Sequence, residues 1–256
     1  MINLQRLNMD NSWFLEFDGL RILVDPWLEG TEVDFFTWFN TQWHRTAPVP
    51  YNELPAFDVV LITQKYPDHF HHQTLEKLQP KLVIGPDSIQ KDLMKLLPNT
   101  EFHALNKKQT KVNVKGIDVH FLPTRRWIDP IYDAIVLSNG NESVYFMTHG
   151  FTLDQAHQEQ LKEVGDCSLL VTPFNLYKLP FFLGGVVSPG IKGVEHLCET
   201  IQPKVVVPTH DEDKYAKGIV SKFAKIKRAT PKELNKYTWL KDRYQAFSDY
   251  KLSSIS

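Results

Sequence analysis

The chain has 256 residues, of which 42% are hydrophobic and 23% are charged, with a formal net charge of -1. This length can bury a substantial core in one large domain or two small ones, and the composition is that of an ordinary globular protein. The overall charge gives no sign of nucleic-acid binding, and no apolar run approaches the roughly 20 residues that span a bilayer.

The N-terminus lacks the cationic segment and long apolar run of a signal peptide, so the expected location is cytoplasmic. The two cysteines, Cys167 and Cys198, each lie in an apolar-rich segment. We therefore expect buried free thiols rather than a disulfide.

Three tight turns punctuate the sequence. Each is a two-residue pair that ends in glycine and separates apolar or β-branched runs, which is a strong local signal for a β-hairpin. The pairs are Asp18-Gly19, Lys115-Gly116 and Asn139-Gly140. They predict many antiparallel strands in the first half of the chain.

From about residue 59 onwards, strands and helices are expected to alternate. A capping pattern that begins at Thr152 predicts a helix to about Val164, and Thr230-Pro231 predicts another helix start. A basic region from about residue 213 is expected to be helical. Because there is no internal repeat or low-complexity linker, we expect a single domain over residues 1–256. This pattern by itself predicts an α/β or α+β protein with two packed sheets.

A polar loop follows the apolar strand expected at residues 59–62. It reads Thr63-Gln64-Lys65-Tyr66-Pro67-Asp68-His69. This segment resembles the H-x-H-x-D-H signature of the metallo-β-lactamase superfamily, with Gln64 and Tyr66 in place of the first two histidines. Asp68 and His69 match the signature. The resemblance implies an α/β fold of the metallo-β-lactamase type, a four-layer αββα sandwich.

Four other strand ends match that family in order, and the resemblance spans roughly residues 12–215. Asp25 matches an aspartate that supports a metal ligand without binding the metal itself. Arg126 stands where the third histidine of the first metal is expected. His149 replaces an aspartate that bridges two metals, and His210 matches the histidine of the second metal. The match is closest to a divergent branch with S-Q-x-x-x-D-H and P-H-G patterns, each only partly kept here.

The resemblance implies one metal in place of two. The positions of the first metal are all replaced, by Gln64, Tyr66 and Arg126. Those of the second survive as Asp68, His69 and His210, and His149 can add an imidazole. Zinc and iron(II) both accept such ligands, and we expect zinc ahead of iron(II) as the one divalent metal.

The expected function is a metal-dependent hydrolase that acts on an ester, lactone or phosphodiester with one metal-bound water. Asp68 or His149 would assist proton transfer, and Tyr66 would donate a proton to the leaving group or fill the vacated space. The alternative is a catalytically inactive member of the fold that binds a ligand or partner through the same cleft.

Three residues are candidates for contact with a small-molecule substrate, anionic or acyl-bearing: Arg126, Gln64 and Trp127. A guanidinium at position 126 offers a planar fork for a carboxylate or phosphate. The alternative for Arg126 is a structural salt bridge with Asp68.

Two apolar segments, residues 35–43 and 181–187, fall in connections that rim the active-site edge of the fold that the chain resembles. An acyl substrate or a membrane surface would explain exposed aromatics there, but we favour packing of the two segments on each other as a satellite core.

Residues 214–236 hold eight Lys or Arg and one Asp or Glu. We interpret them as a solvated helix face and expect no nucleic acid. The oligomeric state stays open.

Overall fold

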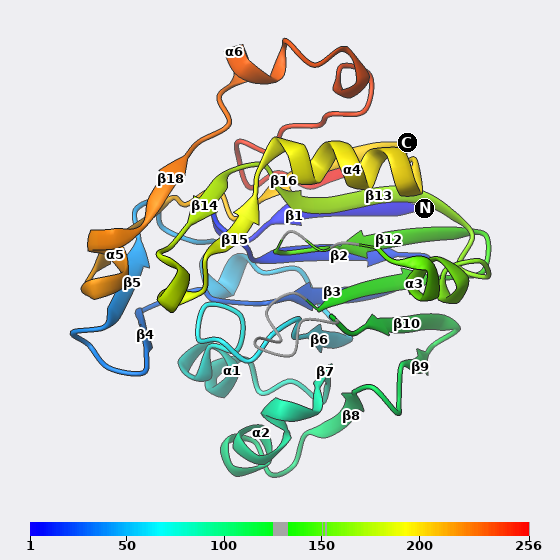
Figure 1. Ribbon diagram of the computed structural model, residues 1–256. Helices are drawn as coiled ribbons and strands as arrows, with labels where there is room; N and C mark the ends of the chain where they lie inside the picture. Colours follow the sequence, from blue (N-terminus) through cyan, green and yellow to red (C-terminus); the bar gives the residue numbers. More distant parts are fainter. Residues whose placement is uncertain (125–132, 150, 152, 256) are drawn as a thin grey trace.

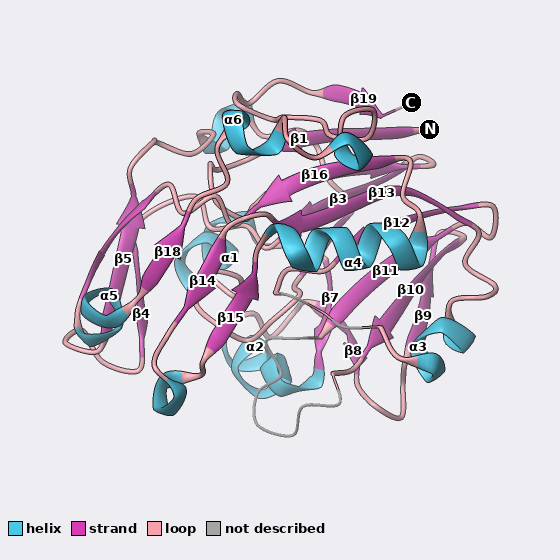
Figure 2. Ribbon diagram, turned by 45° about the horizontal axis from the view of Figure 1, so that its top comes forward, coloured by secondary structure: helices cyan, strands magenta, loops and turns pink. Residues whose placement is uncertain are grey.

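The computed structural model describes residues 1–124, 133–149, 151 and 153–255, and these residues form a layered sandwich (Figure 1). Two large β-sheets pack face to face at the centre, and helices cover the outer face of each sheet (Figures 1 and 2). The expected αββα architecture is confirmed.

The first large sheet has the strand order β19-β1-β2-β3-β6-β7-β8. Its strands are β1 (Ile2–Arg6), β2 (Trp13–Phe17), β3 (Leu20–Val24), β6 (Val59–Leu61), β7 (Leu82–Pro86), β8 (Glu101–Leu105) and β19 (Ser253–Ile255). Strands β3, β6, β7 and β8 pair in parallel. The carboxyl ends of β3 and β6 therefore lie side by side, which brings Asp25 next to Thr63.

The second large sheet has the order β16-β13-β12-β11-β10-β9. Its strands are β9 (Lys111–Val114), β10 (Ile117–Leu122), β11 (Ala134–Ser138), β12 (Glu142–Phe146), β13 (Asp166–Pro173) and β16 (Val205–Thr209). Strands β12, β13 and β16 are parallel. Their carboxyl ends share one edge, where the chain continues into His149 and His210.

The glycine turns form as predicted. Asp18 and Gly19 have φ angles of 50° and 84°, and Lys115 and Gly116 have 50° and 86°. Two consecutive left-handed residues are the signature of a type I′ turn, whose twist matches that of the strands it joins. The third pair, Asn139-Gly140, joins β11 to β12, which are antiparallel.

Successive side chains along the strands face two different hydrophobic clusters. In β6, Val59 and Leu61 face the second sheet, whereas Val60 faces the helices outside the first sheet.

The helices are α1 (His72–Leu78), α2 (Gln90–Leu96), α3 (Gln155–Gln160), α4 (Ile191–Ile201), α5 (Ile219–Phe223) and α6 (Pro231–Leu234), with 3-10 turns η1 (Tyr51–Glu53), η2 (Asp87–Ile89), η4 (Phe181–Leu183) and η5 (Thr238–Leu240). Cys167 and Cys198 are buried free thiols, as expected.

Two small sheets lie together at one end of the sandwich (Figures 1 and 2). One has the order β17-β5-β4 and the other β15-β14-β18. Their strands are β4 (Thr31–Asp34), β5 (Asn40–His44), β14 (Leu176–Lys178), β15 (Val186–Pro189), β17 (Lys214–Lys217) and β18 (Lys225–Lys227). In the described part of the chain, no helix has both the length and the apolarity to cross a membrane.

Several local predictions need correction. The region after residue 213 is not simply helical, because β17 pairs with β5 and β18 pairs with β14. Helix α3 begins later than predicted: its N-cap is Asp154, which forms a capping box with His157. Position 152 lies outside the described residues. The helix cap at Thr230 is confirmed.

The two aromatic segments do not form a satellite core. Phe36 and Trp38 stack on each other with ring centroids 5.5 Å apart, but both side chains remain largely exposed. Phe181 and Phe182 are also exposed. The rings within residues 35–39 pack on each other, and residues 181–187 do not cover them.

Candidate functional site

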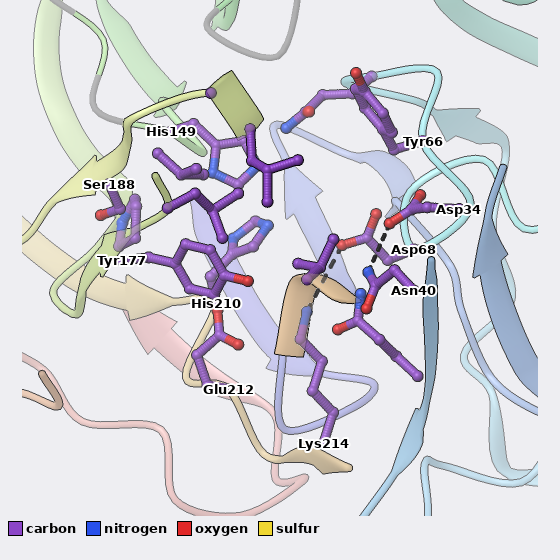
Figure 3. Close-up of a pocket in the computed structure, with 18 of the residues that line it drawn as sticks. Asp34, Asn40, Tyr66, Asp68, His149, Tyr177, Ser188, His210, Glu212 and Lys214 are labelled. Carbon is purple, nitrogen blue, oxygen red and sulfur yellow. Dashed lines mark hydrogen bonds and ion pairs between the residues drawn. The ribbon is translucent and has the colours of Figure 1, made fainter. Parts of the chain in front are cut away.

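Three histidines from three strand ends meet at one edge of the sandwich. His69 comes from the loop after β6, His149 follows β12, and His210 directly follows β16. One ligand atom from each histidine lies within 4.8 Å of the other two. Because parallel strands end at the same edge, residues far apart in the sequence converge here, and Figure 3 shows His149 and His210 side by side.

Asp25 fixes the orientation of His69. Its Oδ1 accepts the Thr63 backbone N–H at 2.7 Å, and its Oδ2 accepts the Thr63 hydroxyl at 2.6 Å. The same Oδ2 lies 2.7 Å from Nδ1 of His69. An ionised carboxylate only accepts hydrogen bonds, so Nδ1 carries a proton and Nε2 is the ring nitrogen that faces His210.

The electrostatic surroundings differ among the three rings. Burial, with the nearby His69, lowers the pKa of His149 to about 3 and holds the pKa of His210 well below its usual value. Burial also opposes charge on His69, but Asp25 and Asp68 outweigh it and raise the pKa of that ring. At neutral pH, His149 and His210 are therefore neutral imidazoles with a free lone pair.

The spacing of two of the three histidine nitrogens fits a tetrahedral metal ion. Nε2 of His69 and Nε2 of His210 are 3.3 Å apart. Two nitrogens bound to a tetrahedral zinc ion at about 2.0–2.1 Å would be separated by about 3.3–3.4 Å. Three imidazoles with a position left open is also the ligand pattern of catalytic rather than structural zinc.

Asp68 lies beside the histidine group. Its Oδ2 is 3.8 Å from His69 Nε2 and 3.8 Å from the ammonium of Lys214. Burial would raise the pKa of Asp68, but the positive charges of His69 and Lys214 outweigh this and lower it. The carboxylate is therefore ionised at neutral pH, close enough to assist the histidines although it is not one of the three that converge most tightly.

Lys214 is a buried cation at the base of the site. Its side chain is 7% exposed and donates a hydrogen bond of 2.9 Å to Asp10. Burial opposes its charge, but Asp10, Glu212 and Asp68 together hold the pKa of Lys214 well above its usual value. Lys214 thus neutralises part of a buried group of carboxylates.

The site opens into a cavity of about 750 Å³ (Figure 3). Its polar lining includes Asp68, His149 and His210. Its apolar lining includes Phe35, Phe39, Leu179, Phe181, Phe182 and Val220. One cavity therefore combines charged and hydrophobic side chains.

Two further acids line this cavity. Burial raises the pKa of Asp34 to about 6 and that of Glu212 to about 7. Asp34 accepts a hydrogen bond of 2.8 Å from the amide of Asn40, drawn in Figure 3. Both acids therefore change protonation close to neutral pH.

A family model described as a beta-lactamase superfamily domain matches residues 8–210. The chain belongs to the metallo-β-lactamase superfamily. The match covers β2 through β16 and therefore every strand end that carries a histidine of the group. No curated protein matches the chain.

Solved structures of this superfamily share the fold. An isothiocyanate hydrolase from Delia radicum gut bacteria aligns with a TM-score of 0.69 and 17% identity, covering 99% of each chain. A possible metal-dependent hydrolase from Veillonella parvula gives a TM-score of 0.69 and 14% identity, covering 99% of this chain and 98% of that one. A metallo hydrolase from Ignicoccus hospitalis gives 0.63 and 16%, covering 98% and 97%.

Gln64 and Tyr66, which the resemblance places at two metal-ligand positions of the metallo-β-lactamase superfamily, both line the cavity. Gln64 donates a hydrogen bond of 2.8 Å to the Thr148 hydroxyl, which ties the end of β6 to the end of β12. Tyr66 lies on the opposite side of the cavity from His149 in Figure 3. Their roles toward substrate stay predictions, as do those of Arg126 and Trp127, which lie outside the described residues.

The metallo-β-lactamase resemblance did not reveal Asp10, Glu212 or Lys214. One signal was available: Asp211-Glu212-Asp213 follows His210 directly, an acidic run at the end of a buried strand. Such a run would need nearby cations or protons to be buried. Lys214, the first residue of the basic region, supplies one of these charges.

Proposed function

We propose that the chain is a metal-dependent hydrolase that holds one divalent ion through His69, His149 and His210. The observation that carries the proposal is the convergence of three imidazoles, one of them oriented by Asp25 and the other two lining an open cavity. When bound, the ion would supply Lewis acidity and lower the pKa of a water molecule. Zinc suits this ligand set best, and iron(II) is the second choice.

Asp68 is the general base of the proposed reaction. Its ionised carboxylate stands 3.8 Å from His69 Nε2, on the cavity side, where it can accept a proton from an attacking water. Lys214 keeps this carboxylate ionised in spite of its burial. Tyr66 is the candidate proton donor to the leaving group, since it lines the same cavity.

The substrate of the proposed hydrolase is an ester, a lactone or a phosphodiester that also carries an apolar chain. The reacting group of the substrate would lie against the histidines, and its apolar chain would lie against Phe39, Leu179 and Val220. Burying an acyl chain against such side chains contributes about 0.8 kcal/mol for each CH₂ group. An acyl ester therefore suits the cavity better than a small polar ester.

The test is hydrolysis of a panel of esters of increasing chain length, lactones and a phosphodiester by zinc-loaded protein. The wild type should hydrolyse a member of the panel and prefer longer acyl chains. His210→Ala should lose at least about 100-fold in kcat/KM, because the ion would lose one of three ligands. His196→Ala is the matched control, since His196 is exposed on α4, and it should keep full activity.

If zinc-loaded wild type turns over no member of the panel, the proposal of hydrolysis fails. The protein would then be an inactive member of the metallo-β-lactamase superfamily that binds a ligand through the same cavity. A chain-length preference in binding, measured by displacement of a fluorescent fatty acid, would support that second reading.

A further inference from the structure

Large aromatic side chains are exposed on the segments that line the cavity. This aromatic rim consists of Phe35, Phe36, Trp38, Phe181, Phe182 and Phe223, with exposed fractions of 72%, 59%, 61%, 95%, 78% and 51%. Scattered surface aromatics are ordinary, but a contiguous group of this kind marks an interaction site.

The rim is contiguous because three separate segments are bound together. The backbone N–H of Ile219, at the start of α5, donates to the carbonyl of Trp38 at 3.1 Å. Strand β18, which follows α5, pairs with β14, which leads into η4. Figures 1 and 2 both show the β4–β5 connection and α5 together at the end of the molecule formed by the two small sheets.

The same surface is basic. Residues 35–43, 176–188 and 215–227, which carry the rim, contain no Asp or Glu. They do contain exposed lysines, Lys178, Lys217, Lys222, Lys225 and Lys227, of which Lys227 pairs with Glu233 at 3.3 Å. Exposed aromatic side chains and lysines on segments without acidic residues complement the interface of an anionic bilayer, where rings enter the headgroup region and each lysine contributes about 1 kcal/mol.

We propose that the aromatic rim and its lysines dock the protein on the surface of a bilayer that contains anionic lipid. A second copy of the chain is a poorer occupant. In a two-fold dimer the same patch meets itself, so lysines would face lysines with no acidic residue in the rim segments to pair with them.

Docking would place the cavity mouth at the lipid surface. Phe35, Phe181 and Phe182 belong to the rim and also line the cavity, so the two surfaces are continuous. An amphipathic lipid could then pass from the bilayer to the histidines without crossing water. This consequence rests on the proposed function, whereas the docking itself does not.

The test is co-sedimentation of the full chain with vesicles of phosphatidylcholine alone and of phosphatidylcholine mixed with phosphatidylglycerol. The wild type should bind the mixed vesicles at least about tenfold more tightly, and added salt should weaken this binding. Trp38→Ser with Phe223→Ser should reduce binding at least about tenfold, because both rings belong to the rim. Leu252→Ser is the matched control: Leu252 is 52% exposed near the C-terminus and should have no effect.

The lysines are tested separately. Lys222→Glu with Lys225→Glu should abolish the preference for anionic vesicles, whereas Lys91→Glu with Lys95→Glu on α2 should leave it intact. Failure of the wild type to bind mixed vesicles would overturn the proposal. So would a concentration-dependent dimer in sedimentation velocity that the Trp38→Ser, Phe223→Ser variant loses, because the rim would then be a self-contact.

The docking and the hydrolysis can fail independently. His210→Ala should still bind vesicles. Trp38 and Phe223 do not line the cavity, so the Trp38→Ser, Phe223→Ser variant should still hydrolyse a short, water-soluble member of the substrate panel. Lost vesicle binding in His210→Ala would contradict the placement of the docking surface on the rim.

Discussion

The carboxylate of Asp25 accepts a hydrogen bond from Nδ1 of His69 across 2.7 Å, and both side chains are fully buried. Asp25 directly follows β3 and His69 lies in the loop after β6, so parallel pairing of these two strands makes the contact. A partner on one ring nitrogen sets which nitrogen is free to bind an ion and makes it more basic. The proposed metal site would therefore depend on Asp25 for the orientation of one of its three histidines.

Asp25→Asn should weaken zinc binding about 10- to 100-fold. Asparagine has only one acceptor oxygen, and its amide nitrogen would take the place of one carboxylate oxygen. In one orientation the nitrogen faces the Thr63 N–H; in the other it faces the Thr63 hydroxyl and His69 Nδ1. Either way, at least one of the hydrogen bonds that Asp25 accepts is lost. Competition with a chromophoric chelator measures the affinity. Asp18→Asn, in an exposed turn, is the control and should bind zinc like the wild type. Equal affinities for the two variants would show that Asp25 does not orient the ligand.

Lys214→Met should lower the free energy of unfolding by about 3–5 kcal/mol, because it leaves the buried Asp10 carboxylate without its ion-pair partner. Lys111→Met removes an exposed ion pair with Asp118 and should cost about 0–1 kcal/mol. Urea denaturation of the metal-free proteins provides both values. A Lys214 variant as stable as the Lys111 variant would contradict a buried charge network.

His44 should make the protein less stable as the pH falls below about 6.5. Burial lowers the pKa of His44 in the folded chain to about 4, whereas the unfolded chain has the ordinary value of about 6.5. Between these values the unfolded state binds a proton that the folded state does not, so acid favours unfolding. Stability from this residue is complete above about pH 6.5 and is lost toward pH 4.

His44→Phe removes this titration and keeps an aromatic ring against Trp27, where the two ring centroids are now 3.9 Å apart. The loss of stability between pH 7.5 and pH 5.5 should be smaller in the variant by about 1 kcal/mol. Denaturant unfolding at both pH values measures the difference. Identical losses in variant and wild type would mean that the half-buried His44 ring does not have a lowered pKa.

Local signals predicted several strands and turns well because they agree with the long-range structure, whereas the four-layer sandwich was predicted from the family resemblance. The left-handed pairs at Asp18-Gly19 and Lys115-Gly116 have few alternatives to a type I′ turn. The run Val59 to Ile62 is apolar at every position because both faces of β6 are covered. These turns and this apolar run can be recognised without knowing which distant strand pairs with the segment.

The convergence of the histidines could be anticipated only from the family resemblance. His149 and His210 meet because β12, β13 and β16 are parallel neighbours, and no local feature of the sequence encodes that order. Once the strand ends are known to share an edge, the residue types at those ends point to a metal.

The burial of Lys214 could not be predicted. It lies in a basic stretch that resembles a solvated surface, and it is buried because β17 pairs with β5, with Lys214 opposite His44. The exposed state of Phe181 and Phe182 was also unpredictable, since an apolar segment gives no sign of whether another segment will cover it.

The metal content of the protein tests the central claim most directly. Purified without chelator and dialysed, the wild type should retain roughly one divalent ion per chain by mass spectrometry, and His69→Ala with His210→Ala should retain almost none. A second ion is not expected, because the Lys214 ammonium lies 3.8 Å from the Asp68 carboxylate and would repel it. A wild-type chain without metal, a double variant with as much metal as the wild type, or two ions per chain would each contradict the single histidine-held metal proposed for this cavity.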